Sequence, residues 1–213
     1  PVITCVPATL TATEKTEIVN RVTNDFSPFN MIITTDEAVY NAALNNKRQR
    51  VIITDSWEWF GQAGGASFMN TFTQGTNTPC FVFSSLLSYS PKRIAEASSH
   101  EAGHTLGLRH QSTYNANCVK ISEYNIGQGS GEIGFAPIMG NSYSQNLSLW
   151  HKGPNSTGCN NIQDDLAIIA SKVGYKTDDY SNTFANSAAL TTSLNGIINN
   201  STDIDYFSIS LPT

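Results

Sequence analysis

The chain has 213 residues, 39% of them hydrophobic and 14% charged, which supports one domain of ordinary size with an appendage and a core that needs no metal ion for stability. Its net charge is −5 and its only basic cluster is KRQR at 47–50, which excludes the charge pattern of a nucleic-acid-binding or anionic-membrane-binding protein. No apolar run approaches the ~20 residues that span a bilayer, and no signal sequence opens the chain, so we expect a soluble, mature or trimmed monomer without membrane insertion.

The first quarter of the chain predicts an alternation of strands and helices. A β-prone run, an amphipathic helix, a buried strand, a short helix and a second buried strand are expected at residues 2–6, 10–26, 31–35, 36–46 and 50–55. Thr11 and Glu14 have capping-box spacing at the start of the first helix. This order favours an α+β fold, in which helices pack on a twisted mixed β-sheet.

The middle of the chain predicts an edge strand, a buried strand and a long helix, at residues 63–72, 80–87 and 90–108. The edge strand is entered through Gly64 and Gly65, and glycines in a strand are typical of an edge or of a close backbone approach. The helix begins with Ser90 as N-cap and Pro91 in its first turn, and it ends at Gly107.

Beyond residue 110 the pattern becomes irregular. Residues 111–160 are rich in Gly, Asn and Ser, which predicts loops rather than a second sheet, and a helix closes this part at 161–174. Alternating DYFSISL and turn-like NG and NN pairs then predict a short β-rich tail. We expect one domain over 1–175, with subdomains 1–110 and 111–175, and a boundary near 176.

Four cysteines occur singly, without a C-x-x-C pair. An even number of scattered cysteines favours two disulfides in an oxidising compartment, and three pairings are possible. We favour Cys5–Cys80 and Cys118–Cys159, because each pair would staple one side of the stretch at 98–110 to itself. Four buried free thiols in a cytosolic protein remain the alternative.

Three of the four histidines of the chain fall in SSHEAGHTLGLRH, residues 98–110. On a helix, His100 and His104 project from the same face, and the break at Gly107 lets the chain return so that His110 supplies a third nitrogen. Three neutral imidazoles form the open tetrahedral site that catalytic zinc prefers. The alternative, a surface pair of histidines at i and i+4, is common, but the added glycine and third histidine argue against it.

Glu101 lies between the first two histidines and is offset from their face. It can therefore reach a water molecule beside the ion rather than bind the ion itself. Zinc lowers the pKa of water towards ~7 and polarises a carbonyl group, and Glu101 would act as general base and then as general acid. The sequence thus predicts a zinc-dependent hydrolase with Glu101 as its catalytic residue.

The string HEAGHTLGLRH resembles the H-E-x-x-H-x-x-G-x-x-H signature of the metzincin zinc metallopeptidases in every fixed position. This resemblance implies a sheet-and-helix upper half, an active-site helix and a loop-rich lower half. It also implies a methionine turn beneath the metal, for which APIMG offers Met139. An ordinary core methionine is the alternative. The implied activity is that of a secreted, extracellular endopeptidase acting on protein or peptide substrates, and several segments resemble large bacterial members.

Some positions depart from the family pattern or are less specific. The position two residues after Met139, where some metzincins have a tyrosine, holds Asn141, and the nearest tyrosine is Tyr143. The resemblance implies that an edge strand binds extended substrate, here through Gly64, Gly65 and Ala66, and that residues 141–155, with Tyr143, wall the pocket. Glycines in an ordinary turn are the alternative. His151 in this segment is expected to be a surface or pocket-wall residue.

Two further features concern the ends of the chain. Residues 176–213 resemble the beginning of the bacterial pre-peptidase C-terminal domain, about half of such a module. In this tail Asp178, Asp179, Asp203 and Asp205 could bind Ca²⁺, with turn and cap roles as the alternative. At the other end, Cys5 could block zinc as a cysteine switch, although the even cysteine count favours a disulfide.

Two rival functions remain. One is a binding or adhesive protein with an inactive zinc site, which the retention of Glu101 argues against. The other is a zinc hydrolase acting on a non-peptide amide, which a substrate panel would separate from a peptidase.

Overall fold

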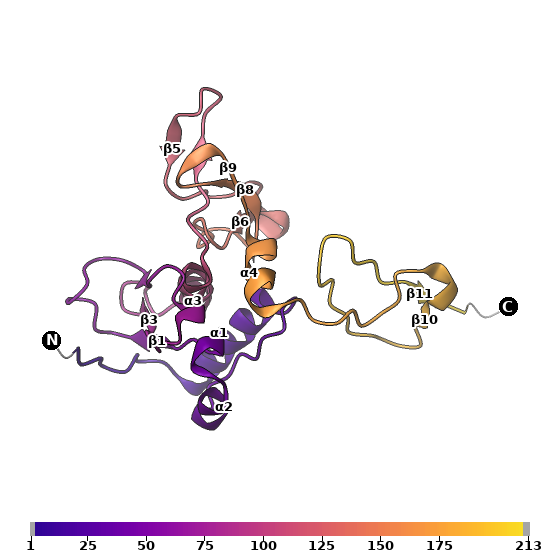
Figure 1. The fold of residues 1–213 in the computed structure, drawn as a ribbon, viewed down its shortest axis with the longest axis horizontal. Coiled ribbons are helices and arrows are strands. Elements are labelled where there is room, and N and C mark those ends of the chain that lie inside the picture. Colours follow the sequence, from indigo (N-terminus) through magenta and orange to yellow (C-terminus); the bar gives the residue numbers. More distant parts are fainter. Residues whose placement is uncertain (1–2, 211–213) are drawn as a thin grey trace.

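The longest helix, α3, lies at the centre of the molecule, with the N-terminal elements below and beside it and the segments that follow it above (Figure 1). The computed structural model describes residues 3–210; Val2 of the first predicted strand and residues 211–213 of the tail lie outside the described residues. The four α-helices are α1 Ala12–Asp25, α2 Glu37–Ala42, α3 Pro91–Leu106 and α4 Asp165–Val173. The fold is therefore α+β, as predicted.

The main sheet has three strands: β1 Val51–Thr54, β2 Gly65–Ala66 and β3 Cys80–Phe83. Its order is β1-β3-β2, with β1 parallel and β2 antiparallel to β3, so the sheet is mixed. The short strand β2 is at its edge, where Gly65 pairs with Val82 and Ala66 with Phe81. The predicted strand at 50–55 is confirmed over 51–54 and the one at 80–87 over its first half, 80–83, and the predicted edge strand shrinks to two residues.

Helix α1 packs against α3, and its first turn has the predicted capping box between Thr11 and Glu14. The apolar core has two parts. One lies between α1, α3 and β3 and includes Ile18, Val82 and Ile94. The other lies between α3, α4 and the segment around Met139. Together they fix the position of α3 from both sides.

The predicted strand at 31–35 is wrong. These residues form neither a helix nor a strand, and Ile32 is exposed. An apolar cavity of about 460 Å³ separates them from β1 and is lined by Ile18, Met31, Ile33 and Val51, among others. The β-branched run is thus kept apart from β1.

The segments after α3, predicted to be loops, instead contain six short strands that pair into three two-stranded sheets joined by loops. The strands are β4 Thr113–Tyr114, β5 Lys120–Ser122, β6 Phe135–Pro137, β7 Leu147–Leu149, β8 Lys152–Asn155 and β9 Gly158–Asp164. Their pairs are β4 with β5, β6 with β7 and β8 with β9. The predicted helix at 161–174 starts later than expected, because its first residues belong to β9 and Asp164 is its N-cap.

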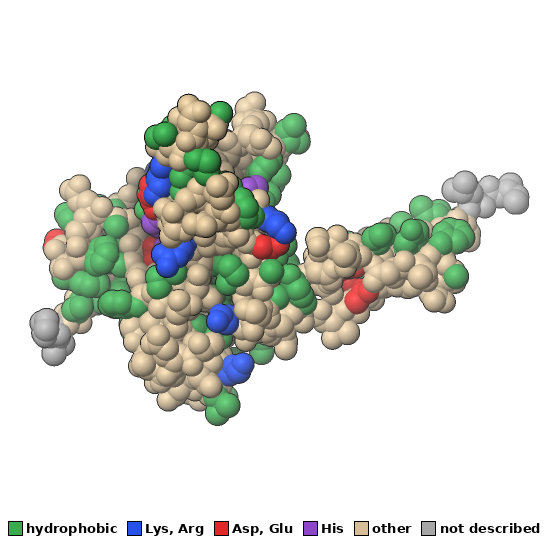
Figure 2. All heavy atoms as spheres, turned by 45° about the horizontal axis from the view of Figure 1, so that its top comes forward, with side chains coloured by type: hydrophobic (Ala, Val, Ile, Leu, Met, Phe, Trp, Pro, Cys, Tyr) green, Lys and Arg blue, Asp and Glu red, His purple; other side chains and the backbone are tan. Residues whose placement is uncertain are grey.

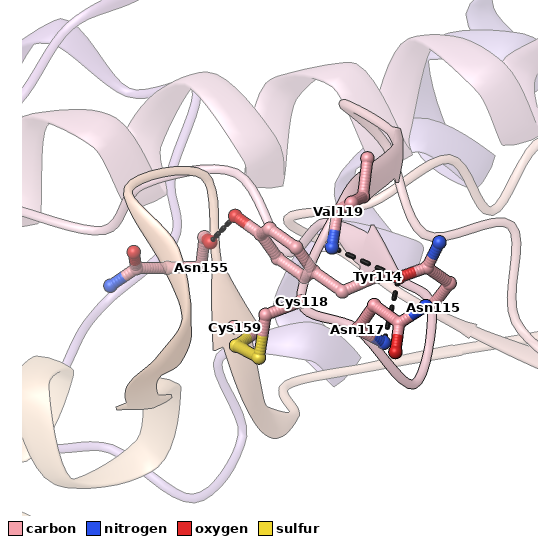
Figure 3. Close-up of a disulfide and its surroundings, with 7 residues drawn as sticks. All are labelled: Tyr114, Asn115, Asn117, Cys118, Val119, Asn155 and Cys159. Atoms are coloured by element: carbon pink, nitrogen blue, oxygen red, sulfur yellow. Dashed lines mark hydrogen bonds between the residues drawn. A yellow bond between two sulfur atoms is a disulfide. The ribbon is translucent and has the colours of Figure 1, made fainter.

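A disulfide joins Cys118 to Cys159, as predicted (Figure 3). It ties the turn between β4 and β5 to β9. Beside it, the Tyr114 hydroxyl donates to the Asn155 backbone oxygen at 2.7 Å, and the Asn115 side chain accepts from the backbone nitrogens of Asn117 and Val119 (Figure 3). The part of the chain that follows α3 is thus cross-linked although it has few long strands.

The predicted Cys5–Cys80 disulfide is wrong, since both thiols are free. Cys80 pairs with Val51 at the start of β1, whereas Cys5 lies near the other end, where the neighbouring Val6 accepts from Asp55. Four residues of strand correspond to about 13 Å, and a disulfide needs Cα atoms within about 7 Å. Strand register therefore keeps the two cysteines apart.

The tail leaves the body after Lys176 and extends to one side (Figures 1 and 2). Its two short strands, β10 Ala188–Ala189 and β11 Phe207–Ser208, pair with each other in parallel. Its assignment as a partial C-terminal domain stays a prediction. Among the described residues, none of the helices combines the length and apolarity needed to cross a membrane.

Candidate metal centre

Helix α3 brings two of the three histidines to the site and its end brings the third. Ser90 and Pro91 start the helix as predicted, and Gly107 ends it with φ = 106°, a left-handed conformation that glycine adopts without strain. The Gly107 nitrogen donates to the His104 backbone oxygen, and the chain then turns back. This turn carries His110 to the face where His100 and His104 project.

The ligand atoms of His100, His104 and His110 lie within 4.8 Å of one another. The two closest, the Nε2 atoms of His104 and His110, are 3.2 Å apart. In Figure 2, histidine side chains (purple) lie where the lobe at the top of the view meets the rest of the molecule. The three-histidine group predicted from the sequence is therefore assembled and could hold a metal ion.

The hydrogen bonds of the three rings fix their tautomers. His100 Nδ1 donates to the Ile138 backbone oxygen and His104 Nδ1 to the Leu108 backbone oxygen, each at 2.7 Å. His110 Nδ1 donates to Glu123 Oε1, also at 2.7 Å. Because each acceptor is an oxygen without a proton, each Nδ1 carries the hydrogen and each Nε2 of a neutral ring presents a lone pair.

Burial also favours the neutral form of His100 and His104. It lowers the pKa of His100 to about 3 and that of His104 to about 4, and the neighbouring histidines add to the shift. Because each Nδ1 already donates, the Nε2 atoms of His104 and His110, 3.2 Å apart, can hydrogen-bond to each other only if one ring is protonated, whereas a cation between them would use both lone pairs. The donor set therefore fits a metal ion better than it fits a histidine cluster without one.

Glu101 is buried beside the histidines and is held in place from two sides. Its Oε2 accepts from Ser67 Oγ at 2.5 Å. A Cβ atom on Gly65 would lie 2.6 Å from Glu101 Cγ, so the absence of a side chain in β2 makes room for this carboxylate. Burial raises the pKa of Glu101 to about 7, against the hydrogen bond from Ser67.

Met139 is fully buried in the turn Pro137–Gly140, where the Gly140 nitrogen donates to the Pro137 oxygen. It packs beneath α3: a Cβ atom on Gly103 would lie 2.6 Å from Met139 Sδ. The neighbouring Ile138 supplies the carbonyl that orients His100. The turn thus supports the histidines through one backbone bond and one close side-chain contact.

A cavity of about 480 Å³ opens over the three histidines and Glu101. Its walls include all four residues predicted to bind substrate: Gly64, Gly65, Ala66 and Tyr143. Tyr143 lies close across the cavity, since a Cβ atom on Gly64 would be 2.8 Å from its hydroxyl oxygen. Asn141 and Ser142 also line the cavity, whereas the rest of 141–155, with His151, does not.

Sequence reasoning missed four residues of the site. Ser67 bonds to Glu101, Glu123 orients His110, and Tyr124 lies against His110 with ring centroids 4.5 Å apart. Glu96 lines the cavity as well. Only Glu96 had a signal in the sequence, since it lies four residues before His100 and so on the same face of α3.

The other proposed ligands behave differently. Cys5 is not among the residues that line the cavity. In the tail, carboxylate oxygens of Asp178, Asp179 and Asp205 lie within 4.8 Å of one another. Asp203 does not join them, and its Oδ2 instead accepts from the Asn199 backbone nitrogen at 2.7 Å.

Comparisons with family models, with curated proteins and with solved structures found no match to this chain, so its chemistry has to be argued from its own residues.

Proposed function

We propose that this protein is a secreted zinc endopeptidase of the metzincin type. The observation that carries the proposal is the pairing of three Nε2 lone pairs with the carboxylate of Glu101 in one cavity. A purely structural metal site has no use for a buried carboxylate that is not a ligand. Such a carboxylate beside an open metal site is what hydrolysis requires.

The geometry of the donors supports zinc. A tetrahedral ion with Zn–N bonds of about 2.0–2.1 Å separates its nitrogens by about 3.3–3.4 Å. The Nε2 atoms of His104 and His110 are 3.2 Å apart, so little movement is needed to bind. When bound, zinc supplies a Lewis acid that polarises a carbonyl group and lowers the pKa of water.

Residues of the protein would transfer the proton that the attacking water loses. Glu101 accepts a proton from the attacking water and returns it to the leaving amine. Ser67 holds Oε2 of Glu101, which leaves Oε1 free for this exchange. The pKa of Glu101, raised towards 7 by burial, suits a group that must both accept and donate near neutral pH.

A peptide substrate is favoured by the edge strand. Strand β2 is at the open edge of the sheet and its residues line the cavity. An extended chain can add to such an edge through main-chain hydrogen bonds. Gly65 would let it approach within reach of Glu101. The Cys118–Cys159 disulfide is compatible with an extracellular location.

The test replaces Glu101 by Gln and measures both zinc content and hydrolysis of a denatured protein. We expect one zinc ion per chain in both forms and a loss of activity of at least about 10²-fold in the variant, because the general base is removed. Glu132→Gln, an exposed glutamate far along the chain from the motif, is the matched control and should keep full activity. Equal activity of Glu101→Gln and wild type would overturn the mechanism.

A further inference from the structure

Glu96 is buried in the wall of the active-site cavity without a use in the proposed mechanism. Its exposed fraction is 5%, and it lies one helical turn before His100 on α3. It lines the same cavity as the three histidines and Tyr143. A carboxylate so placed costs free energy unless its oxygens find partners.

One oxygen of Glu96 has its partner and the other has none. Lys92 Nζ donates to Oε1 of Glu96, and also to the backbone oxygens of Ser142 at 3.0 Å and Tyr143 at 3.5 Å. These bonds use all three N–H groups of the lysine. Oε2 of Glu96 is buried and has no hydrogen-bond partner among the described residues.

These contacts define which chemical group a ligand must present to Glu96. Lys92 already neutralises Glu96, so the site does not call for a second cation. The orphan oxygen can only accept. A substrate side chain that enters the cavity and comes against this oxygen must bring a donor, or it leaves the oxygen unsatisfied.

We propose that Glu96 is a specificity-determining residue that selects a substrate side chain ending in an uncharged hydrogen-bond donor, such as a carboxamide or a hydroxyl. This rests on the proposed peptidase function. The side chain enters the cavity between α3 and Tyr143 while the backbone lies along β2. Apolar side chains of the same length leave Oε2 without a donor, and carboxylates are repelled by it.

The test uses one peptide series in which Gln, Met, Lys or Glu in turn occupies each position within three residues of the cleaved bond. For the zinc-loaded wild-type chain we expect kcat/KM at one position to be about tenfold higher for Gln than for Met, and lowest for Glu. Equal rates for Gln and Met at every position would overturn the proposal. A preference for Lys over Gln would also overturn it, because the site would then select charge.

Glu96→Gln provides the second arm. The amide oxygen can still accept from Lys92, which turns the amide NH₂ towards the cavity. The variant should therefore raise the ratio of kcat/KM for the Glu peptide to kcat/KM for the Met peptide about tenfold over the wild-type ratio. An unchanged ranking of the four peptides would contradict the proposal, and Glu132→Gln serves as the matched control.

Binding separates this inference from the proposed function. Dissociation constants of the same peptides for the zinc-loaded Glu101→Gln chain, measured by calorimetry, do not depend on turnover. If no peptide is cleaved by wild type, the peptidase proposal fails, and the calorimetric ranking still decides the role of Glu96: Gln bound more tightly than Met supports it, and equal binding contradicts it.

Discussion

At the scale of single residues, glycines decide where Glu101 and Met139 can lie. Gly65 leaves space for Glu101, and Gly103 leaves space for Met139. In both cases the atom that a Cβ would meet belongs to a side chain of the site. The motif H-E-x-x-H leaves position 103 unspecified, yet here its contact with Met139 requires glycine.

Gly65→Ala is predicted to impair catalysis without loss of zinc. The added methyl group would lie 2.6 Å from Glu101 Cγ and 2.7 Å from the Phe81 backbone oxygen, so the carboxylate must move. A misplaced catalytic group costs on the order of 10²-fold in rate. We expect that loss in kcat with unchanged zinc stoichiometry. Gly158→Ala, whose Cβ would meet only the Asn161 side chain, should behave as wild type.

Asp25 is predicted to make stability depend on pH. Burial raises the pKa of its carboxyl group to about 7, against the hydrogen bond from Ser99. Between about pH 4 and 7 the folded chain therefore keeps a proton that the unfolded chain has lost, so stability falls as pH rises through this window. Above pH 7 the penalty is complete and constant.

Asp25→Asn removes this ionisation and keeps an acceptor for Ser99. Urea unfolding at pH 4.5 and pH 8 should show the variant gaining on wild type as pH rises, by at most about 4 kcal/mol. A difference between the two proteins that is the same at both pH values would show that Asp25 does not titrate in this window.

At the scale of elements, local patterns predicted those structures whose causes are local. The capping box of α1, the start of α3 at Pro91 and its end at Gly107 depend on neighbours in sequence, and all three were predicted. The three histidines follow from the same helix and its glycine. Residues 31–35 show the limit, because a β-branched run becomes a strand only if another edge reaches it.

Contacts between distant segments were predicted less well. Glu123 orients His110, and Ser67, 34 residues before Glu101, holds its carboxylate. No sequence spacing predicts either contact. The Cys5–Cys80 pairing failed because strand register, which sequence did not give, separates the two residues. The Cys118–Cys159 pairing succeeded, and its ring contains both Glu123 and Met139.

Removing this disulfide is predicted to destabilise the metal centre as well as the fold. Closing a loop with a sequence separation of 41 is worth about 4 kcal/mol in the chain-entropy treatment. Cys118→Ser should lower the free energy of unfolding by about 2–4 kcal/mol and weaken zinc retention against a chelator. Cys80→Ser, which removes a free thiol, should leave zinc retention unchanged.

At the scale of the whole molecule, the body and the tail are organised differently. The body has its helices on both sides of α3 and a core in two parts, whereas the strands of the tail pair only with each other. The bonds at their junction involve Tyr175, which bridges to Phe29, Lys176, whose nitrogen donates to the Pro28 oxygen, and Asn199 of the tail, whose Nδ2 donates to the Lys176 oxygen at 3.0 Å. The residues that line the candidate site all precede this junction.

A chain that ends at Lys176 is therefore predicted to fold and to bind zinc. We expect its melting temperature to lie within about 2 °C of that of the full chain, because the removed segment leaves the core intact. Calorimetry and zinc analysis of the two chains provide the measurement. Loss of cooperative unfolding in the shortened chain would place the boundary elsewhere.

The disulfide also determines what cleavage of the chain by any protease would do. Between Cys118 and Cys159 lies a glycine-rich stretch in which Ile126 and Ile133 are exposed, the kind of surface segment that proteases nick first. One cut there would leave two fragments joined through sulfur, with Glu123 and Met139 still attached to the body. On a denaturing gel, a nicked molecule would migrate as one band without a reductant and as two bands with one. The two bands would therefore not show that the residues of the site had separated in the folded molecule.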